Sequence, residues 1–170
     1  MRIILTLSTL AALLVVGMFP AVAGDGDFGR TEDGTVVPFS LTQELQAVSS
    51  DPSGRCAPLL TITLVGSGVA TDLGAFAEVE TDCFNPVTLE FEDVKATITA
   101  ADGSQLFAQA EGVLIPTGTP GEFEISGSVT FVGGTDRFEA ATGSASGSGS
   151  FNFGTGQGTN ILKGVLILSP

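Results

Sequence analysis

The sequence predicts an all-β domain, an antiparallel barrel of about eight strands, with a β-sandwich as the alternative arrangement. From Thr35 onward, apolar and polar residues alternate with a period of two, as in strands that bury one face. Glycine and proline stand at the junctions between the alternating segments, where turns are expected. No stretch has a helical period longer than a turn or two, and strands do not alternate with helices.

About eight alternating segments follow one another along the chain. In the first two, the apolar side chains share a parity, so each segment has one face suited to a core. The third segment, 75–83, alternates small apolar residues with Phe76, Glu78 and Glu80. The apolar residues of the first two segments are Val37, Phe39, Leu41 and Leu45, then Leu60, Ile62 and Leu64, and the later segments are 87–100, 105–115, 123–131, 144–153 and 160–168.

Two local signals refine these strands. In segment 87–100 the apolar parity changes from odd to even at Glu92-Asp93, which predicts a β-bulge or a break in the strand. The dipeptide Asp102-Gly103 stands between two alternating segments and predicts a tight hairpin turn.

The first 23 residues are typical of a secretory signal peptide. A basic residue precedes a long apolar run, and a proline and the small-residue triplet Ala21-Val22-Ala23 follow. An uncleaved membrane anchor is the alternative, because the apolar run approaches the length that spans a bilayer. Cleavage would leave a flexible, glycine-rich leader, 24–34, and one domain, 35–170, with no further helical membrane span. The predicted location is secreted, periplasmic or extracellular.

The charge balance excludes several classes of partner. Without the signal peptide, five basic residues face 19 carboxylates, a formal balance of −14. Nucleic acid and anionic membrane surfaces are poor partners for such a chain, because both are bound through lysine and arginine. A cationic partner stays open, although an acidic surface that resists aggregation is the simpler interpretation. The sequence does not determine the oligomeric state.

The chain has two cysteines, Cys56 and Cys83, and in an exported protein the pair predicts a disulfide. The midpoint between them falls in 66–74. If that segment turns, the strands on either side run antiparallel and bring the cysteines together. Because the chain has no histidine, a zinc site is not expected, and no cofactor is predicted.

The absence of histidine also excludes Ser-His-Asp and Cys-His catalytic arrangements. Carboxylates remain: Glu78 and Glu80 share a face, as do Glu90 and Glu92, and such pairs serve acid–base chemistry or calcium binding. Their alternation with apolar residues predicts instead that they lie on the solvent face. Enzymatic activity is therefore not the favoured function.

The stretch VTFVGGTDRFEAATGSASGSGS, 129–150, lacks the lysine and the following helix of a phosphate-binding loop. We interpret it as a corner of the barrel. Two glycines end one strand, a short turn follows at 136–141, an arginine pairs with a nearby carboxylate, a phenylalanine closes the barrel end, and a glycine begins the next strand. These corner residues are Gly133, Gly134, Arg137, Phe138 and Gly143.

This corner resembles the GGTGxFxGAxG corner of allene oxide cyclase and dirigent-like barrels, and of small secreted bacterial proteins with a GGTGRFxGATG-type corner. The hairpin ATITAADGSQLFAQAEG and the turn VATDLGAF also resemble those bacterial sequences. The resemblance implies an eight-stranded antiparallel barrel whose interior can hold an apolar molecule. Asp136 and Ala140 stand where the family has glycine, and the pocket residues of the plant enzymes have no counterparts here. The resemblance therefore implies the fold and not the activity.

Two functions are consistent with these features. The favoured one is an exported, non-catalytic barrel that binds a small apolar molecule or serves as an envelope or extracellular interaction module. The alternative is a cyclase or isomerase that shapes a reactive apolar substrate beside a buried carboxylate of raised pKa. A barrel whose interior is filled by its own side chains is an equally weighted alternative to ligand binding. An outer-membrane barrel would need girdles of Trp and Tyr, and the chain has neither residue. The candidate lumen residues are Phe39, Leu64, Phe91, Phe107 and Phe131.

Overall fold

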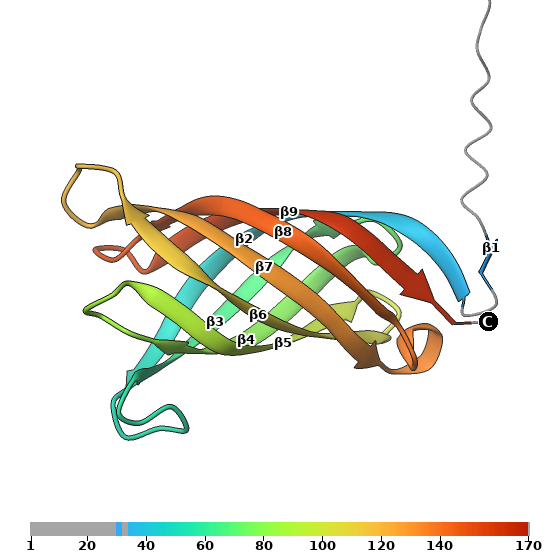
Figure 1. Cartoon of the computed structure of the whole chain (residues 1–170), viewed down its shortest axis with the longest axis horizontal. Helices are drawn as coiled ribbons and strands as arrows, with labels where there is room; N and C mark the ends of the chain where they lie inside the picture. The colour runs from blue at the N-terminus through green and yellow to red at the C-terminus, as the bar shows by residue number, and fades with distance from the viewer. Residues whose placement is uncertain (1–29, 32–33, 170) are drawn as a thin grey trace, which may run out of the picture.

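The computed structural model describes residues 30–31 and 34–169, which form a closed antiparallel barrel of eight strands with almost no helix (Figure 1). Each strand from β2 to β9 pairs with the next along the chain, and β9 pairs with β2 to close the barrel. The predicted barrel is confirmed, and the sandwich is not adopted. The strands are β1 Arg30–Thr31, β2 Gly34–Asp51, β3 Leu60–Ala70, β4 Gly74–Phe84, β5 Glu90–Ala100, β6 Gln105–Pro116, β7 Glu122–Gly134, β8 Thr142–Asn152 and β9 Gln157–Leu168.

The predicted signal peptide, 1–23, and most of the predicted leader, 24–34, lie outside the described residues. In the described part of that leader, β1 pairs with Gly34 and Thr35 at the start of β2. This part of β2 pairs with β9 on one side only, so its other edge accepts a short added strand.

Both local signals in the sequence are confirmed. The backbone N–H of Ala100 donates to Ser104 O and that of Gly103 donates to Ala100 O, which closes the β5–β6 turn, and Gly103 has a φ of 90°. The pairing of β5 with both neighbouring strands shifts around Asp93, which has a φ of 47°. This bulge changes the phase of β5, so that Phe91 before it and Val94 after it both face the interior.

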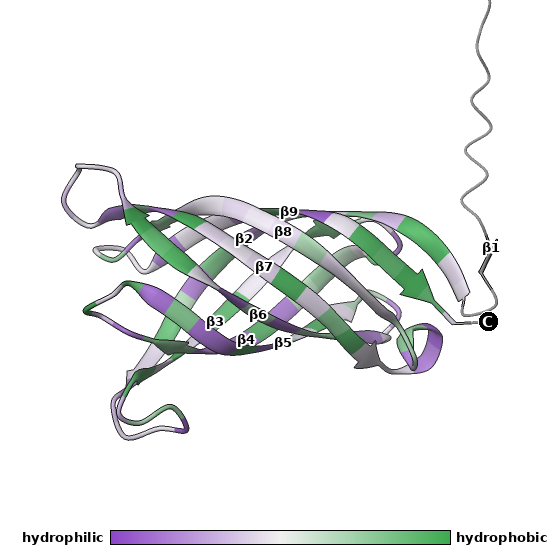
Figure 2. Ribbon diagram, viewed as in Figure 1, coloured by the Kyte–Doolittle hydropathy of each residue, from purple (hydrophilic) through white to green (hydrophobic). Residues whose placement is uncertain are grey.

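The interior of the barrel has a closed half and an open half. In the closed half, large apolar side chains such as Phe131, Leu106 and Leu166 are at most 1% exposed and fill the interior. In the open half, apolar side chains line the lumen without filling it. Figure 1 shows η1 and the end of β9 at the closed end and the longer loops at the opposite end. Hydrophobic and hydrophilic residues alternate along the strands, and β8 is pale because it consists mainly of glycine and serine (Figure 2).

The glycine-rich corner lies at the closed end. β7 ends at Gly134, the short 3-10 helix η1 spans Asp136–Phe138, and β8 begins at Thr142, one residue before the predicted Gly143. Phe138 is 1% exposed and belongs to the core of the closed half. Arg137 Nε lies 3.5 Å from Asp102 Oδ2 of the β5–β6 hairpin.

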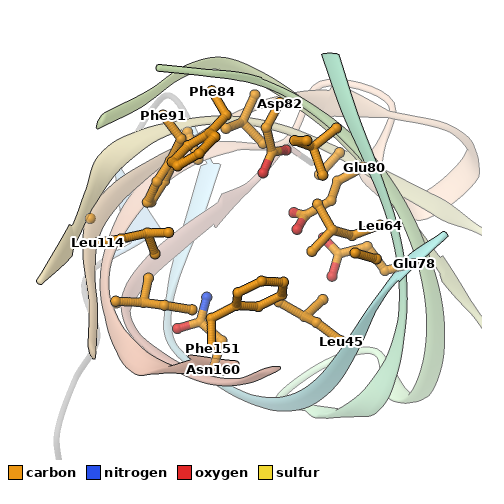
Figure 3. A pocket seen from close by; sticks show the side chains of 18 of the residues that line it. Leu45, Leu64, Glu78, Glu80, Asp82, Phe84, Phe91, Leu114, Phe151 and Asn160 are labelled. Atoms are coloured by element: carbon orange, nitrogen blue, oxygen red, sulfur yellow. The ribbon is translucent and has the colours of Figure 1, made fainter. Parts of the chain in front are cut away.

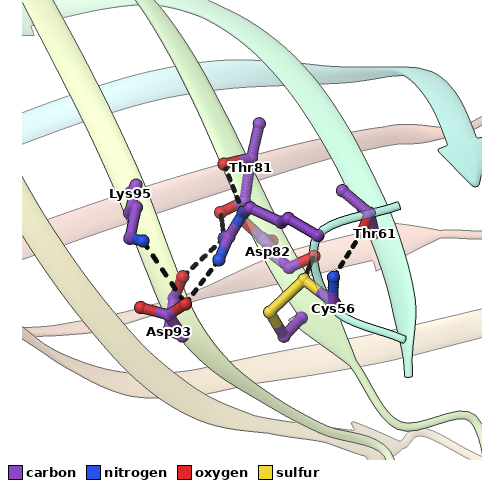
Figure 4. Close-up of a disulfide and its surroundings, with 8 residues drawn as sticks. Cys56, Thr61, Thr81, Asp82, Asp93 and Lys95 are labelled. Atoms are coloured by element: carbon purple, nitrogen blue, oxygen red, sulfur yellow. Dashed lines mark hydrogen bonds and ion pairs between the residues drawn. A yellow bond between two sulfur atoms is a disulfide. The ribbon is translucent and has the colours of Figure 1, made fainter. Parts of the chain in front are cut away.

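A disulfide joins Cys56, in the β2–β3 loop, to Cys83 near the end of β4, as predicted (Figure 4). β3 and β4 form an antiparallel hairpin in which Thr61 stands opposite Cys83, and the Cys56 N–H donates to Thr61 Oγ1 at 3.1 Å. Successive strand residues point to opposite faces, so the loop is held against the outer face of β4 while the neighbouring Asp82 points inward.

Candidate ligand-binding cavity

The open half of the barrel contains a cavity of about 530 Å³, with walls from all eight strands β2 to β9. Small-molecule sites typically have volumes of about 300–1,000 Å³ and mostly apolar walls with a few polar groups. Figure 3 shows this arrangement: Phe91 and Leu114 lie across the lumen from Glu78 and Glu80. The barrel is therefore not filled by its own side chains in this half.

Small residues on the inward faces of the strands leave the space that the cavity occupies. Ala110, Gly127 and Gly147 line it from β6, β7 and β8. A Cβ atom on Gly147 would lie 2.3 Å from Leu162 Cδ2, a separation that the present packing excludes. The glycines of the sequence thus provide room for larger neighbours and for the lumen itself.

Three acidic side chains, Glu78, Glu80 and Asp82, follow one another on the inward face of β4 and line the cavity. The prediction that Glu78 and Glu80 face solvent is wrong. Phe76 shares their parity and is 6% exposed in the core, whereas Val79 of the opposite parity is 53% exposed. Packing of the aromatic side chain decides the phase of β4 and carries the acids inward.

Burial raises the pKa of each of these three carboxyls, which together we call the carboxyl row. The pKa of Glu78 is raised to about 7, chiefly by burial and then by the charge of Asp82, against a hydrogen bond from Gln43 that lowers it. Burial and the charges of Asp82 and Glu78 raise the pKa of Glu80 well above its ordinary value. Burial raises the pKa of Asp82 to about 7, although the charge of Arg55 lowers it. Burial therefore favours the neutral form of all three carboxyls over the charged form.

Four buried side-chain oxygens of cavity residues have no hydrogen-bond partner among the described residues. They are Gln43 Oε1, Glu78 Oε2, Asp82 Oδ1 and Asn160 Oδ1. As placed, all four are acceptors. A buried polar atom without a partner costs about 1–3 kcal/mol, so a molecule in the lumen that donates hydrogen bonds is favoured.

Aromatic side chains surround the open end of the cavity. The ring of Phe153, which is 45% exposed, lies 5.0 Å from Phe123, 5.2 Å from Phe151 and 5.7 Å from Phe84. Phe153 follows β8 and lines the cavity together with Phe84 and Phe151. These rings form an apolar rim that an incoming molecule would contact first.

The predicted lumen residues fall in three places. Phe39 and Phe131 contact each other in the closed half, with ring centroids 4.7 Å apart, and are part of the filled core. Leu64 and Phe91 line the cavity. Phe107 does not face the lumen: it stands between Leu106 and Ala108, both buried inside, so its side chain points outward and is half-buried.

The other predicted acidic pair, Glu90 and Glu92, is exposed on β5. Within 30–31 and 34–169, no group of three or more metal-ligating side chains is arranged to hold a metal ion. The same residues include no helix long and apolar enough to cross a membrane.

The sequence matches no protein-family model and no curated protein. The fold is similar to the solved structure of the pterocarpan synthase dirigent protein PsPTS1, with a TM-score of 0.52 and 15% sequence identity. The likeness covers 82% of this chain and 99% of that chain. It shows a shared dirigent-like barrel fold, in agreement with that part of the resemblance in the sequence.

Proposed function

We propose that this protein is an exported barrel that binds a small, largely apolar molecule in its lumen and performs no covalent chemistry of its own. The observation that supports this function is the cavity of about 530 Å³, whose walls are mainly apolar and carry a few polar groups, among them the three carboxyls of β4 and the amides of Gln43 and Asn160. Ligand sites commonly combine such walls with a few polar groups that fix the orientation of the ligand.

The fold agrees with this proposal. The dirigent protein of similar fold is named a pterocarpan synthase, which associates a barrel of this kind with a small organic molecule. We extend the relationship to the allene oxide cyclases and to the secreted bacterial proteins, on the basis of the Gly-Gly-Thr corner at 133–135.

The disulfide supports function outside the reducing cytoplasm, since structural disulfides persist in oxidising compartments. Together with the signal-like residues 1–23, it favours a secreted or periplasmic protein. An envelope or extracellular interaction module would have the same location, but it would not need an open lumen.

Native mass spectrometry of the protein purified from its own secreting cells tests the binding function. We expect a species heavier than the polypeptide by the mass of one small molecule, lost when the protein is denatured. A bare polypeptide mass, together with no uptake of added apolar compounds, would leave the interaction module as the better proposal.

A second function, that of a cyclase or isomerase, is favoured by one observation. Carboxyls with pKa values of about 7, as at Glu78 and Asp82, can exchange protons with a bound substrate at neutral pH. The test is to incubate the co-purified molecule with the protein and with the Asp82→Asn variant. An isomeric product formed by the unaltered protein alone would support catalysis, and an unchanged molecule would support binding only.

A further inference from the structure

The charges of the described side chains are divided unequally between the two faces of the barrel. Every carboxylate and lysine on β2 and on β5 to β9 is exposed. β3 carries no charged residue. Glu78, Glu80 and Asp82 line the cavity from the inward face of β4, whereas Glu111 of β6 borders it with an exposed side chain. Arg55, the cation that acts on Asp82, binds the outer face of the sheet. The described lumen therefore has acidic groups and no basic side chain to balance them.

The buried polar atoms of cavity residues that lack a partner among the described residues are all oxygens. Gln43 and Glu78 line the cavity and are 4% and 5% exposed, and each has a side-chain oxygen without a hydrogen-bond partner among the described residues. Asp82 and Asn160 add one such oxygen each. A ligand that suits these four acceptors must bring several hydrogen-bond donors.

We propose that the lumen selects small amphiphiles carrying a protonated primary amine, with the ammonium group among Glu78, Glu80 and Asp82 and the apolar body against the opposite wall. This inference rests on the binding function proposed above and specifies its ligand class. An ammonium group supplies both a positive charge and three N–H donors. Phe91 and Leu114 lie across the lumen from the acids and would contact the apolar body (Figure 3).

Other ligand charges fit this lumen less well. A carboxylate or phosphate would place a negative charge beside three acids in a cavity of low dielectric, where like charges repel strongly. A neutral alcohol donates one hydrogen bond and leaves most of the acceptors without partners. A quaternary ammonium brings the charge but no N–H donor.

Binding of a cation is coupled to the protonation of the row. Below about pH 7, protons occupy carboxyls of raised pKa, and an ammonium group must displace them. The affinity for an amine should therefore rise with pH from 5 to 8, while the amine itself stays protonated. The affinity for an alcohol should change little.

Four probes with the same alkyl chain separate these possibilities: octylamine, octyltrimethylammonium, octanol and octanoate, titrated calorimetrically into the intact protein at pH 5 and pH 8. At pH 8 we expect octylamine to bind about 10–100-fold more tightly than octanol, as a charge-assisted hydrogen bond would give. Octyltrimethylammonium should fall between them, and octanoate should bind most weakly. Equal binding of octylamine and octanol, or tighter binding of octanoate, would overturn the inference and leave the binding function standing. If none of the four binds, the binding function itself fails.

The variant Glu78→Gln/Glu80→Gln locates the effect. It keeps the side-chain volumes and removes two charges, so octylamine should lose its advantage while octanol binds as before. Glu124→Gln, on the exposed face of β7, is the matched control and should change neither affinity. If the double variant keeps the full preference for octylamine over octanol, the inference is also overturned. If the double variant does not fold, the four probes titrated into the unaltered protein still test the inference.

Discussion

The guanidinium of Arg55 binds the carboxylate of Asp93 at the outer face of the barrel, with Nη1 2.5 Å from Oδ2 (Figure 4). Its Nη2 group also donates to the backbone oxygens of Thr81 and Asp93. The pairing of β4 with β5 shifts at this point. One side chain of the β2–β3 loop therefore fixes two strands where their own hydrogen-bond ladder is irregular.

Replacement of Arg55 by glutamine should lower the free energy of unfolding by about 1–3 kcal/mol, because hydrogen bonds to a charged group are lost at a half-buried position. It should also raise the pKa of Asp82 further, since the charge of Arg55 lowers that pKa. Urea denaturation and carboxyl NMR titration measure the two effects. Lys95→Gln is the control: Lys95 lies 3.6 Å from the same carboxylate but is 57% exposed, so its loss should cost less than about 0.5 kcal/mol.

Removal of the disulfide with Cys56→Ser/Cys83→Ser should lower the free energy of unfolding by about 3–4 kcal/mol, the chain-entropy contribution for a loop of this size. The measurement is urea denaturation of the variant beside the oxidised protein. The oxidised protein treated with reductant is the control and should approach the variant. A change below about 1 kcal/mol would mean that Arg55 and the hairpin hold the loop without the covalent bond.

The fold was predictable from sequence because each strand repeats the same signal. Alternation of period two, turn glycines and the change of parity at Glu92-Asp93 are local properties, and the structure has strands, turns and a bulge at those positions. The two cysteines allowed one pairing only. The resemblance of the corner to those of known barrels predicted the closure of the sheet, which alternation alone does not distinguish from a sandwich.

The site was less predictable, because alternation shows that a strand has two faces without showing which one is inside. In β4 the small apolar residues at odd-numbered positions indicated that their face lies in the core. Phe76 instead packs inside, on the same face as Glu78 and Glu80. The aromatic residue was the available signal for the buried carboxyls. Phe107 shows the reverse error, since its aromatic character indicated the lumen while its neighbours Leu106 and Ala108 occupy it.

The stability of the protein should depend on pH through the buried carboxyls. The pKa of Glu78 rises from 4.5 to about 7 and that of Asp82 from 3.8 to about 7 on folding. Between about pH 4 and pH 7 the folded state thus binds more protons than the unfolded state. The free energy of unfolding should therefore fall as the pH rises through this window and level off above it. Urea denaturation at half-unit pH steps gives the profile, and a flat profile would contradict the buried row.

Glu78→Gln should remove part of this dependence. At pH 8 the variant no longer buries a negative charge, so we expect it to be more stable than the unaltered protein by about 1–3 kcal/mol. At pH 4 the unaltered carboxyl is protonated, and the two proteins should have similar stability. Glu124→Gln, at an exposed position, serves as the control and should leave the profile unchanged. A loss of stability at pH 8 would show that the ionised Glu78 is favourably paired.

A larger side chain at Ala110 should reduce ligand uptake without preventing folding. Ala110 lines the cavity from β6, so Ala110→Leu would extend into the lumen. We expect the affinity for octanol to fall by about tenfold or more, because the space for the apolar body is reduced. Ala77→Leu adds the same volume on the exposed face of β4 and should bind octanol normally. Equal affinities of the two variants would indicate that the ligand binds outside the lumen.

Two phenylalanines at opposite ends of the barrel should have separable roles. Phe138 is 1% exposed at the closed end, and Phe138→Ala should cost about 3–5 kcal/mol through the cavity it leaves. Phe153 is 45% exposed at the open end, so Phe153→Ala should cost about 1 kcal/mol or less while weakening octanol binding through loss of the aromatic rim. Urea denaturation and calorimetric titration of both variants measure stability and affinity side by side. If Phe153→Ala lowered stability as much as Phe138→Ala and left octanol binding unchanged, the rim would be part of the structural core instead of the approach to the cavity.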